Sequence, residues 1–371
     1  MIFAKNNSEI KGNAVDIYLV GGAVRDTLLG FTPKDRDYVV VGSSPAEMLS
    51  LGFTQVGSDF PVFLHPESKD EYALARTERK SGKGYTGFTV DSSSSVTLEE
   101  DLSRRDLTIN SIAMADSGAV IDPFHGQADL EHKILRHTSG AFREDPVRIL
   151  RIARFLARFG AEWTVAPGTL QLLSEMIATG ETDYLQPERI WKEFAKGLEE
   201  SNTLAMVDFL QRMGMLELPA FSDYSAFRQP SSYAAFNYDA FNAEQDTSVK
   251  FALLFNRTWA RVEAEQSKLP SFVREVAQAF SQFLKFEHAG QYAQRDAVNR
   301  LGIIEELDGL RQKDRFERIL QALSIVAPAS TAALSVDMTR LASFKPSSVI
   351  GECRDGATIS RKIREARIAL L

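Results

Sequence analysis

The order of apolar and polar positions near the start of the chain predicts a strand, a glycine turn, a short helix and a second strand. Residues 17–20 favour a strand, and the two glycines that follow break the pattern. Residues 23–29 can form about two helical turns, which Gly30 ends. Residues 38–41 then predict a second strand. The chain therefore begins its fold with a strand and helix unit that leads into another strand.

The pattern changes from mixed to helical further along. We predict a helix over residues 44–51 and a hairpin of two strands over 60–65 and 71–76. Residues 77–97 are polar and rich in glycine, and a connection of this length is usually functional or disordered. Further helices are predicted to start at residue 98 and to cover 144–159, 185–198 and 203–216. The rest is mostly helical, so the fold class is α+β: a head with a mixed sheet, then an all-helical neck, body and tail.

Two aspartates stand at the entrance of the second predicted strand. Asp35 and Asp37 are two residues apart, and side chains at that spacing on a strand point the same way. Like charges on one face repel unless a cation lies between them, and Mg²⁺ prefers oxygen ligands. We therefore predict a metal site at Asp35 and Asp37.

The glycine turn adds a second chemical feature. Gly21 and Gly22 offer backbone N–H groups where a helix begins, which can cradle phosphate. Arg25 lies one helical turn further and can add a charged contact to the same phosphate. Metal, carboxylates and phosphate cradle together indicate phosphoryl or nucleotidyl transfer. The alternative is a strand and helix unit with two solvated aspartates, and the spacing alone leaves both open.

Longer motifs resemble a known family. The stretches GGAVRDTLLG, KDRD and SRRDLTIN, in that order, resemble the polymerase β-like nucleotidyltransferases and, among them, the bacterial class II CCA-adding enzymes. The resemblance covers roughly the first half of the chain. It implies addition of C, C and A to the 3′ end of tRNA from CTP and ATP, with Mg²⁺ as cofactor and pyrophosphate as the other product.

The resemblance also assigns roles in the head. The stretch EYALAR resembles a strand that supplies a third carboxylate, here Glu71, although a surface glutamate explains the residue equally well. Arg105 is implied to contact the nucleotide, with Asp106 in the same motif and Asn110 selecting ribose. Arg104 is adjacent to Arg105, so on a helix the two side chains point about 100° apart and are not expected to share one task. For Asp106, an Arg–Asp network that holds helix to sheet is an equal alternative.

The predicted neck helix carries a stripe of arginines. Arg148, Arg151, Arg154 and Arg158 recur at three- and four-residue spacing and share one face. Such a stripe is usually a solvated face. Here it follows Asp145, and an aspartate acceptor beside an arginine donor accepts C and A while it rejects G and U. Asp145 and Arg148 match the protein template of the family, and Arg151 and Arg154 match its nucleotide- and triphosphate-binding positions.

Three further segments carry expectations from the resemblance. Residues 77–97 resemble a loop that acts as a lever between C and A addition, and their full length favours complete CCA addition. Residues 120–135 resemble a hinge between head and neck, with a helix that starts at Asp129. Residues 249–260 resemble the helix of an HD-type phosphohydrolase, but Asn256 and Arg257 stand where its His-Asp pair would be. We expect a decayed HD-like scaffold that binds tRNA and has no phosphatase activity.

Length and composition set the frame for these expectations. The chain has 371 residues, which suggests two or three domains, and we predict an extension over 1–15, the head over 16–140, the neck over 141–218 and the body and tail over 219–371. Its single cysteine, Cys353, fits a reducing compartment, and we find no signal peptide and no long apolar run. We expect a cytoplasmic protein that is not bound to a membrane. Its oligomeric state, monomer or dimer, stays open.

The net charge of −7 argues mildly against a nucleic-acid partner, but local patches matter more. Arginines cluster in the predicted neck and in a second group near the end of the chain, at Arg361, Lys362, Arg364 and Arg367. We therefore expect contacts to the backbone of tRNA from the neck and tail.

Other functions remain as alternatives. A bacterial poly(A) polymerase shares these motifs but usually carries a long basic extension, and an enzyme that adds only CC or only A is also possible. A catalytically silent tRNA-binding protein is a further alternative, which the intact aspartate pair disfavours. A dinucleotide-binding domain is disfavoured because the Gly21-Gly22 turn lacks the GxGxxG pattern.

Overall fold

The protein is described here by a computed structural model that covers residues 15–57, 62–80, 88–224, 227–256, 267–351 and 353–371. The chain divides into two compact units, Met1–Gln186 and Pro187–Leu371. The predicted boundaries after residues 140 and 218 differ from this division and remain predictions. The predicted extension lies almost wholly outside the described residues.

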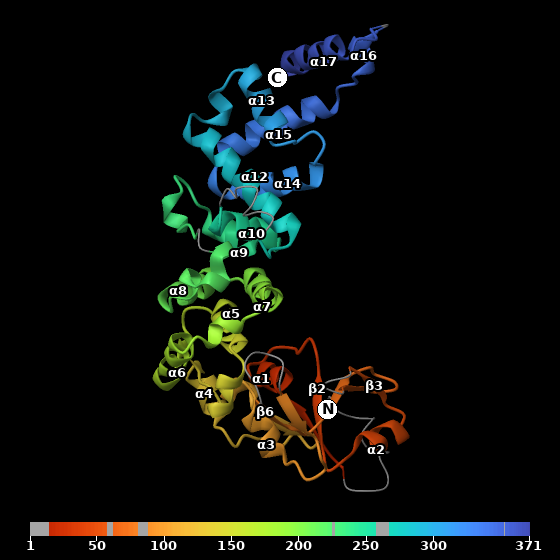
Figure 1. The fold of residues 1–371 in the computed structure, drawn as a ribbon, viewed down its shortest axis with the longest axis vertical. Coiled ribbons are helices and arrows are strands. Elements are labelled where there is room, and N and C mark those ends of the chain that lie inside the picture. Colours follow the sequence, from red (N-terminus) through yellow and green to blue (C-terminus); the bar gives the residue numbers. More distant parts are fainter. Residues whose placement is uncertain (1–14, 58–61, 81–87, 225–226, 257–266, 352) are drawn as a thin grey trace. The chain divides into compact units, whose positions relative to one another are not determined.

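A seven-stranded mixed sheet forms the centre of the first unit (Figure 1). Its strand order is β3-β4-β5-β2-β1-β8-β9, and only β2 and β5 pair in parallel. This confirms the predicted mixed sheet. The strands are β1 (Asp16–Val20), β2 (Asp37–Val41), β3 (Thr54–Val56), β4 (Val62–Leu64), β5 (Glu71–Leu74), β8 (Ala113–Ala115) and β9 (Val120–Ile121).

Helices complete the first unit. They are α1 (Gly22–Leu28), α2 (Pro45–Ser50), α3 (Leu98–Ser103), α4 (Gly126–Glu131), α5 (Val147–Phe159) and α6 (Pro167–Ala178). Short strands β10 (Ile134–Leu135) and β11 (Thr164–Val165) pair in parallel. The helix predicted from residue 44 is α2, which Ser44 and Glu47 begin with a reciprocal capping box.

One face of the sheet packs a small apolar core. Val20 of β1 and Val39 of β2 lie in it with Leu102 of α3. On the other face, the rings of Tyr38 and Tyr72 stack at 4.5 Å between centroids. Because strand side chains alternate, Asp37 lies on the same face as Val39 and therefore beside this core.

The structure corrects two sequence predictions in the head. The segment predicted as a long connection, residues 77–97, contains the antiparallel strands β6 (Thr77–Lys80) and β7 (Phe88–Asp91), and its residues 81–87 lie outside the described part. The helix predicted to start at Asp129 begins three residues earlier, at Gly126. Its first N–H groups, those of Gly126 and Gln127, donate to the Asp122 carboxylate at 2.7 and 2.9 Å. A cap supplied from four residues upstream explains the earlier start.

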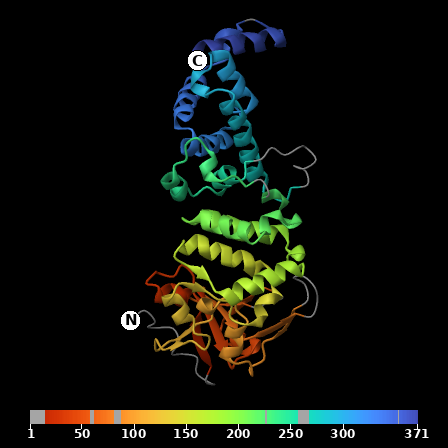
Figure 2. The same ribbon diagram turned by 90° about the vertical axis from the view of Figure 1, so that its left-hand side faces the viewer.

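The second unit contains only helices among its described residues, as predicted from the pattern (Figures 1 and 2). Helix α12 packs against both α10 and α14. The α-helices are α7 (Pro187–Glu199), α8 (Thr203–Arg212), α9 (Tyr238–Ala243), α10 (Thr247–Leu254), α12 (Ser271–His288), α13 (Ala297–Glu306), α14 (Lys313–Val326), α15 (Pro328–Ala342), α16 (Ser347–Ile350) and α17 (Gly356–Leu370).

A buried lysine ties α10 to the turn between α7 and α8. The Lys250 side chain is 0% exposed, and its Nζ donates to the Glu200 carbonyl oxygen at 2.9 Å. Its ammonium lies 5.4 Å from the centroid of the Phe241 ring. Burial lowers the pKa of Lys250 to about 8, although Glu244 and Glu200 oppose the shift. The charged form of Lys250 therefore costs stability in the folded state.

We expect this cost to appear as a pH dependence of stability. Between about pH 8 and 10.5 the folded state loses the Lys250 proton while the unfolded state keeps it, so the free energy of unfolding rises with pH, by about 3 kcal/mol at most. Denaturant unfolding of the second unit at several pH values measures this rise. Lys250→Met should remove it, and Lys285→Met, a change at an exposed lysine of α12, should leave it intact. A rise of equal size in the Lys250→Met variant would contradict the expectation.

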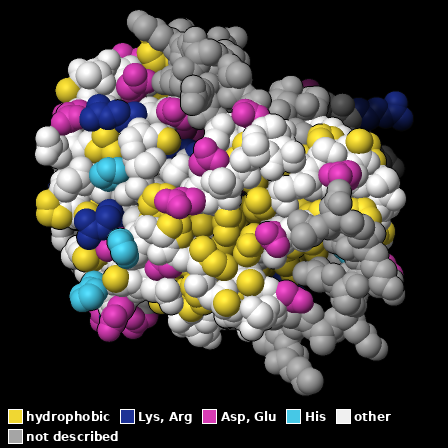
Figure 3. All heavy atoms as spheres, turned by 90° about the horizontal axis from the view of Figure 1, so that it is seen from below, with side chains coloured by type: hydrophobic (Ala, Val, Ile, Leu, Met, Phe, Trp, Pro, Cys, Tyr) yellow, Lys and Arg dark blue, Asp and Glu magenta, His cyan; other side chains and the backbone are white. Residues whose placement is uncertain are grey.

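The surface adds two observations. On the face drawn in Figure 3, apolar side chains gather near the middle, with acidic side chains around them and few Lys or Arg among the described residues. This face therefore offers little attraction for phosphate. None of the described helices is long and apolar enough to cross a membrane.

Candidate functional site

The glycine turn lies between β1 and α1, as the sequence predicts. Gly21 has φ 70° and ψ −130°, a conformation that side chains rarely adopt. A Cβ on Gly21 would also lie 3.0 Å from the Arg105 Nη1 atom. Gly22 is the first residue of α1. The turn therefore needs glycine for its backbone, and the missing side chain leaves room for the Arg105 guanidinium.

The two predicted metal ligands lie next to this turn. Asp37 is the first residue of β2 and pairs in register with Val20, which precedes Gly21. Asp35 lies in the bend before the strand, so the strand geometry used to predict their common orientation applies only to Asp37. Burial raises the pKa of Asp37; Arg105 opposes the shift, and the negative charge of Asp35 adds to it. The two carboxylates thus interact electrostatically, as the prediction required.

The donor set of this pair fits a hard divalent cation. No hydrogen bond or ion pair to another described residue engages the carboxylate of Asp35 or Asp37. Two neighbouring carboxylates that no hydrogen bond or ion pair from a described residue occupies suit a metal such as Mg²⁺. Glu71 is the β5 partner of Asp37 in the parallel register. The described residues nevertheless contain no group of three acidic, His or Cys side chains that could hold a metal, so the third ligand remains a prediction.

Both arginines of the SRRD stretch bind one buried carboxylate. Asp101 is 0% exposed, and its Oδ1 accepts from Arg104 Nη2 at 2.7 Å while its Oδ2 accepts from Arg105 Nη2 at 3.0 Å. The expectation that these arginines do not share a task is therefore wrong. Helix α3 ends at Ser103, and residues three and four positions after Asp101 both reach back to it.

The predicted base-reading residues lie at the start of α5. The Asp145 carboxylate accepts from the Val147 backbone N–H at 3.1 Å and so helps to begin the helix. The Arg148 guanidinium donates to the carbonyl oxygens of Ala141 and Arg104, at 2.9 and 2.7 Å. Both side chains are thus held at one end of α5, and their role in base selection remains a prediction.

A chain of polar contacts joins α1, the SRRDLTIN stretch and α5. Asp106 is buried and accepts from Arg151 Nε at 2.7 Å and from Asn110 Nδ2 at 2.9 Å. The Asn110 oxygen accepts from Arg25 Nη1 at 2.7 Å. Burial alone would raise the pKa of Asp106, but Arg151 and the two hydrogen bonds hold it well below its usual range. These contacts support the alternative that Asp106 belongs to a network holding helix to sheet.

The same chain continues to the other end of α5. Arg25 is 4% exposed, and its guanidinium pairs with Asp26 at 2.8 Å and lies 5.1 Å from the Phe155 ring centroid. Asp26 also accepts from Arg158 Nη2 at 2.9 Å. Burial lowers the pKa of Arg25, and Asp26 opposes the shift. Arg25 and Asn110 are thus engaged inside the protein, while their predicted contacts to phosphate and ribose remain predictions.

The arginine stripe is therefore mostly an interface with the rest of the first unit. Arg148, Arg151 and Arg158 contact Arg104, Asp106 and Asp26 in turn. The fourth, Arg154, stacks on the Phe155 ring at 4.9 Å. Sequence reasoning missed Asp26 and Asp101 as partners of these arginines. The spacing of Asp101 from Arg104 and Arg105 is a usable signal, but no local signal links Asp26 to Arg158.

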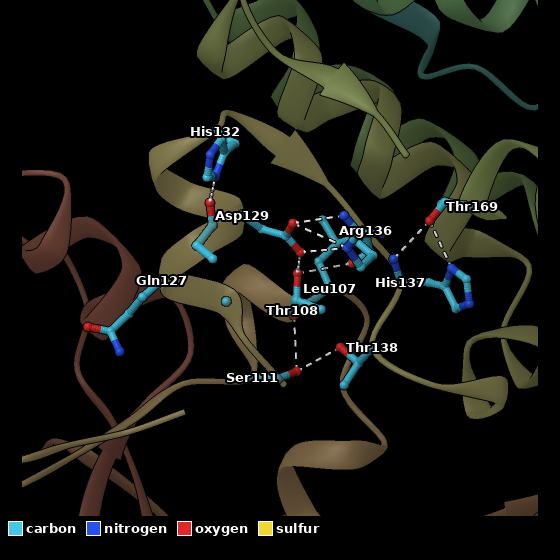
Figure 4. Close-up of polar contacts among 12 residues, drawn as sticks. Leu107, Thr108, Ser111, Gln127, Asp129, His132, Arg136, His137, Thr138 and Thr169 are labelled. Atoms are coloured by element: carbon cyan, nitrogen blue, oxygen red, sulfur yellow. Dashed lines mark hydrogen bonds and ion pairs between the residues drawn. The ribbon is translucent and has the colours of Figure 1, made fainter. Parts of the chain in front are cut away.

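The predicted hinge is held by a second polar network (Figure 4). Asp129 of α4 accepts from Thr108 Oγ1 at 2.7 Å and from Arg136 Nε at 2.9 Å. His137 donates its backbone N–H to Thr169 Oγ1 at 3.0 Å, and a Cβ on Gly126 would lie 2.2 Å from the Thr108 carbonyl oxygen. Close contacts thus join the SRRDLTIN stretch to α4, and the segment around His137 to α6. The hinge role remains a prediction.

Removing the charge of Asp106 should destabilise the first unit. In Asp106→Asn, Arg151 loses its anionic partner, and we expect the free energy of unfolding to fall by about 2 kcal/mol at neutral pH. Because the pKa of Asp106 is lowered in the fold, this contribution is present above the unfolded pKa near 4 and is lost as pH falls below it. Denaturant unfolding at pH 7 and pH 3 measures both effects. Asp116→Asn, at an exposed aspartate, should change neither, and an equal loss in both variants would contradict the assignment.

Comparisons with known proteins bear on the whole chain. A family model described as the Poly A polymerase head domain matches residues 17–136. The CCA-adding enzyme of Bordetella pertussis is 44% identical over 358 residues, which cover 96% of each chain. The Multifunctional CCA protein of Methylobacillus flagellatus is 44% identical over 353 residues, 85% of this chain and 84% of that protein.

Solved structures agree in fold. A CCA-adding enzyme in apo form II aligns with a TM-score of 0.73 at 19% identity, over 96% of this chain and 87% of that chain. The Bacillus stearothermophilus CCA-adding enzyme in complex with CTP aligns with a TM-score of 0.69 at 23% identity, over 96% and 89%. These alignments show a shared fold. Together with the 44% identity that runs along nearly the whole length of both chains, they show that this chain belongs to the family of CCA-adding enzymes.

Proposed function

We propose that the protein adds C, C and A in turn to the 3′ end of tRNA, using CTP and ATP and releasing pyrophosphate. The observation that carries this proposal is the 44% identity with a CCA-adding enzyme over 96% of both chains. The fold is also shared with CCA-adding enzymes solved with CTP, with ATP and, from Thermotoga maritima, with tRNA_CCA. The aspartate pair beside the glycine turn supplies the chemistry that such a reaction needs.

Nucleotidyltransferases of this family depend on divalent metal, and we propose Mg²⁺ held by Asp35 and Asp37. When bound, the metal supplies a Lewis acid that offsets charge on the triphosphate and favours ionisation of the attacking hydroxyl. Glu71 is a candidate third carboxylate because it pairs in register with Asp37. The backbone of Gly21 and Gly22 and the guanidinium of Arg105 would bind phosphate next to this pair.

Base selection would come from Asp145 and Arg148. The arginine donates and the aspartate accepts, which matches the edge that C and A share and mismatches G and U. Carbonyl oxygens hold Arg148 in place, so its guanidinium is oriented before a nucleotide binds. Arg151 and Arg154, on the same helix, would offset negative charge of the triphosphate. Arg25 would offset phosphate charge from its buried position in α1, which follows the glycine turn.

Basic side chains of α5 and α17 are the proposed contacts to the tRNA backbone, because cations attract phosphate. The face drawn in Figure 3 carries few cations among its described residues and is not proposed as a contact. We propose a cytoplasmic location, which the proposed tRNA substrate and the single cysteine support. The second unit is proposed to serve as a scaffold without HD phosphohydrolase activity. There Asn256 Nδ2 donates to the Tyr233 hydroxyl at 2.6 Å, and residue 257 lies outside the described part.

Stepwise substrates test the proposed function. Transcripts of tRNA that end at the discriminator base, after one C or after two Cs are each incubated with protein, Mg²⁺ and a single nucleotide. We expect CTP to extend the first two and ATP to extend only the third. Extension of the first transcript by ATP into a long tail would indicate a poly(A) polymerase. Binding of all three transcripts without extension by either nucleotide would overturn the proposal in favour of a silent RNA-binding protein.

A further inference from the structure

Asp101 is a carboxylate buried in α3 that makes contacts on two sides. Its Oδ1 accepts from the Arg104 guanidinium, through Nη2 at 2.7 Å and Nε at 3.1 Å, and from the Arg76 backbone N–H at 3.2 Å. Its Oδ2 accepts from Arg105, through Nη2 at 3.0 Å and Nε at 3.3 Å. Both oxygens are therefore engaged, each by a different arginine.

Through Arg105, Asp101 is connected to the glycine turn beside the proposed metal ligands. The Arg105 Nη1 atom lies 3.0 Å from where a Cβ on Gly21 would be, so the guanidinium covers the glycine turn. The Arg105 side chain is only 20% exposed, and the Asp101 carboxylate is the anion that pairs with it at its inner end. A shift of Asp101 would therefore move a cation at the phosphate cradle.

Through Arg104, Asp101 is connected to Arg148, which is proposed to select the base. The Arg104 carbonyl oxygen accepts from Arg148 Nη2 at 2.7 Å. The Arg104 side chain is fixed in turn, because its Nε also donates to the Arg76 carbonyl oxygen at 2.9 Å. The backbone that orients Arg148 is thus anchored by the side chain that Asp101 holds.

We propose that Asp101 is a positioning residue for nucleotide binding, which aligns Arg105 with the glycine turn directly and Arg148 with the base through Arg104. The proposal rests on the proposed function, in which Arg105 and Arg148 contact the incoming nucleotide. A buried carboxylate with five donors around it is a rigid anchor, because leaving any of them unpaired is costly. Asp101 itself is 0% exposed, so its proposed action runs through the two arginines and not through contact with the nucleotide.

A double-mutant cycle tests whether Asp101 acts through Arg105. Asp101→Asn keeps the size of the side chain but removes its charge. We expect it to raise the KM for CTP about tenfold in the natural sequence and less than about twofold in the Arg105→Gln background, with kcat changed less than KM. Through Arg148, Asp101→Asn should also lower the preference for CTP over UTP, and this effect should vanish in Arg148→Ala. A purely structural role would give the same fold-change in every background.

Asp26→Asn is the matched control. Asp26 is also buried, also pairs with two arginines and lies in the same unit, but it contacts neither Arg104 nor Arg105. Its effect on KM should be the same with and without Arg105→Gln. If Asp101→Asn does not fold, Asp101→Glu replaces it, because the charge stays while the carboxylate moves by one methylene.

The possible results lead to different conclusions about Asp101 and about the proposed function. Loss of the KM effect in Arg105→Gln supports the proposal. An equal KM effect in both backgrounds, or a lower melting temperature with unchanged KM, overturns it. If the natural sequence extends no tRNA at all, the proposed function fails, and this is seen before any variant is compared.

Discussion

Asp37→Ala and Asp35→Ala should each lower the rate of nucleotide addition by roughly a thousandfold or more while the fold stays intact. The two carboxylates lie beside the glycine turn, and no other described residue neutralises them through a hydrogen bond or ion pair. Single-turnover incorporation of CTP into tRNA measures the effect. Circular dichroism and melting temperature verify the fold. Turnover close to that of the natural sequence in both variants would contradict the metal assignment.

The same site should be a source of instability without metal. Burial raises the pKa of Asp37, so its charged form is unfavourable in the fold at neutral pH. Asp37→Asn removes this charge and its repulsion from Asp35, and we expect the melting temperature of the metal-free protein to rise by a few degrees. Adding Mg²⁺ should stabilise the natural sequence more than the variant. Equal stabilisation of both by Mg²⁺ would place the metal elsewhere.

Arg148→Ala should lower the selectivity for the base more than it lowers the rate of nucleotide addition. A matched donor and acceptor pair contributes about 1 to 3 kcal/mol of discrimination, so we expect the preference for CTP over UTP to fall roughly ten- to a hundredfold. The rate with saturating CTP should fall less. Competition between CTP and UTP for one tRNA transcript measures the preference directly.

Two comparisons make this result specific. Arg143→Ala removes an exposed arginine that pairs with Glu175 and lies five residues before Arg148, and it should leave the preference unchanged. Asp145→Ala should relax the preference as Arg148→Ala does, because it removes the acceptor of the same pair. An unchanged preference in both Asp145→Ala and Arg148→Ala would show that the base is selected by other residues.

The head could be predicted well because its signals are local. Residue types indicated the strand before the glycine turn and the strand after the short helix, and α2 begins at its Ser-Pro signal with a capping box. The structure also confirms the predicted hairpin, since β4 and β5 pair antiparallel. The wrong prediction of where α4 begins also had a local cause. The start of α4 was misplaced because its cap, Asp122, lies four residues before the helix rather than next to it.

The hydrogen bonds and ion pairs of the site could not be predicted, because they join residues that are distant in sequence. The bond from Arg158 to Asp26 spans 132 positions, and that from Arg25 to Asn110 spans 85. The sequence left open whether the arginine stripe is solvated or binds nucleotide, and in the structure most of it binds the head. The ion pairs of Asp101 could have been predicted, since a carboxylate three and four residues before two arginines is a common pairing on helices.

Sequencing of tRNA 3′ ends after reaction shows whether the protein adds the complete CCA sequence. Transcripts that lack CCA are incubated with the purified protein, Mg²⁺, CTP and ATP, and with GTP and UTP as competitors. We expect nearly every extended end to read CCA and then to stop. Ends that read only CC or a single A would contradict complete CCA addition, and ends with long A tails would contradict base selection by a single pocket that serves C and A in turn.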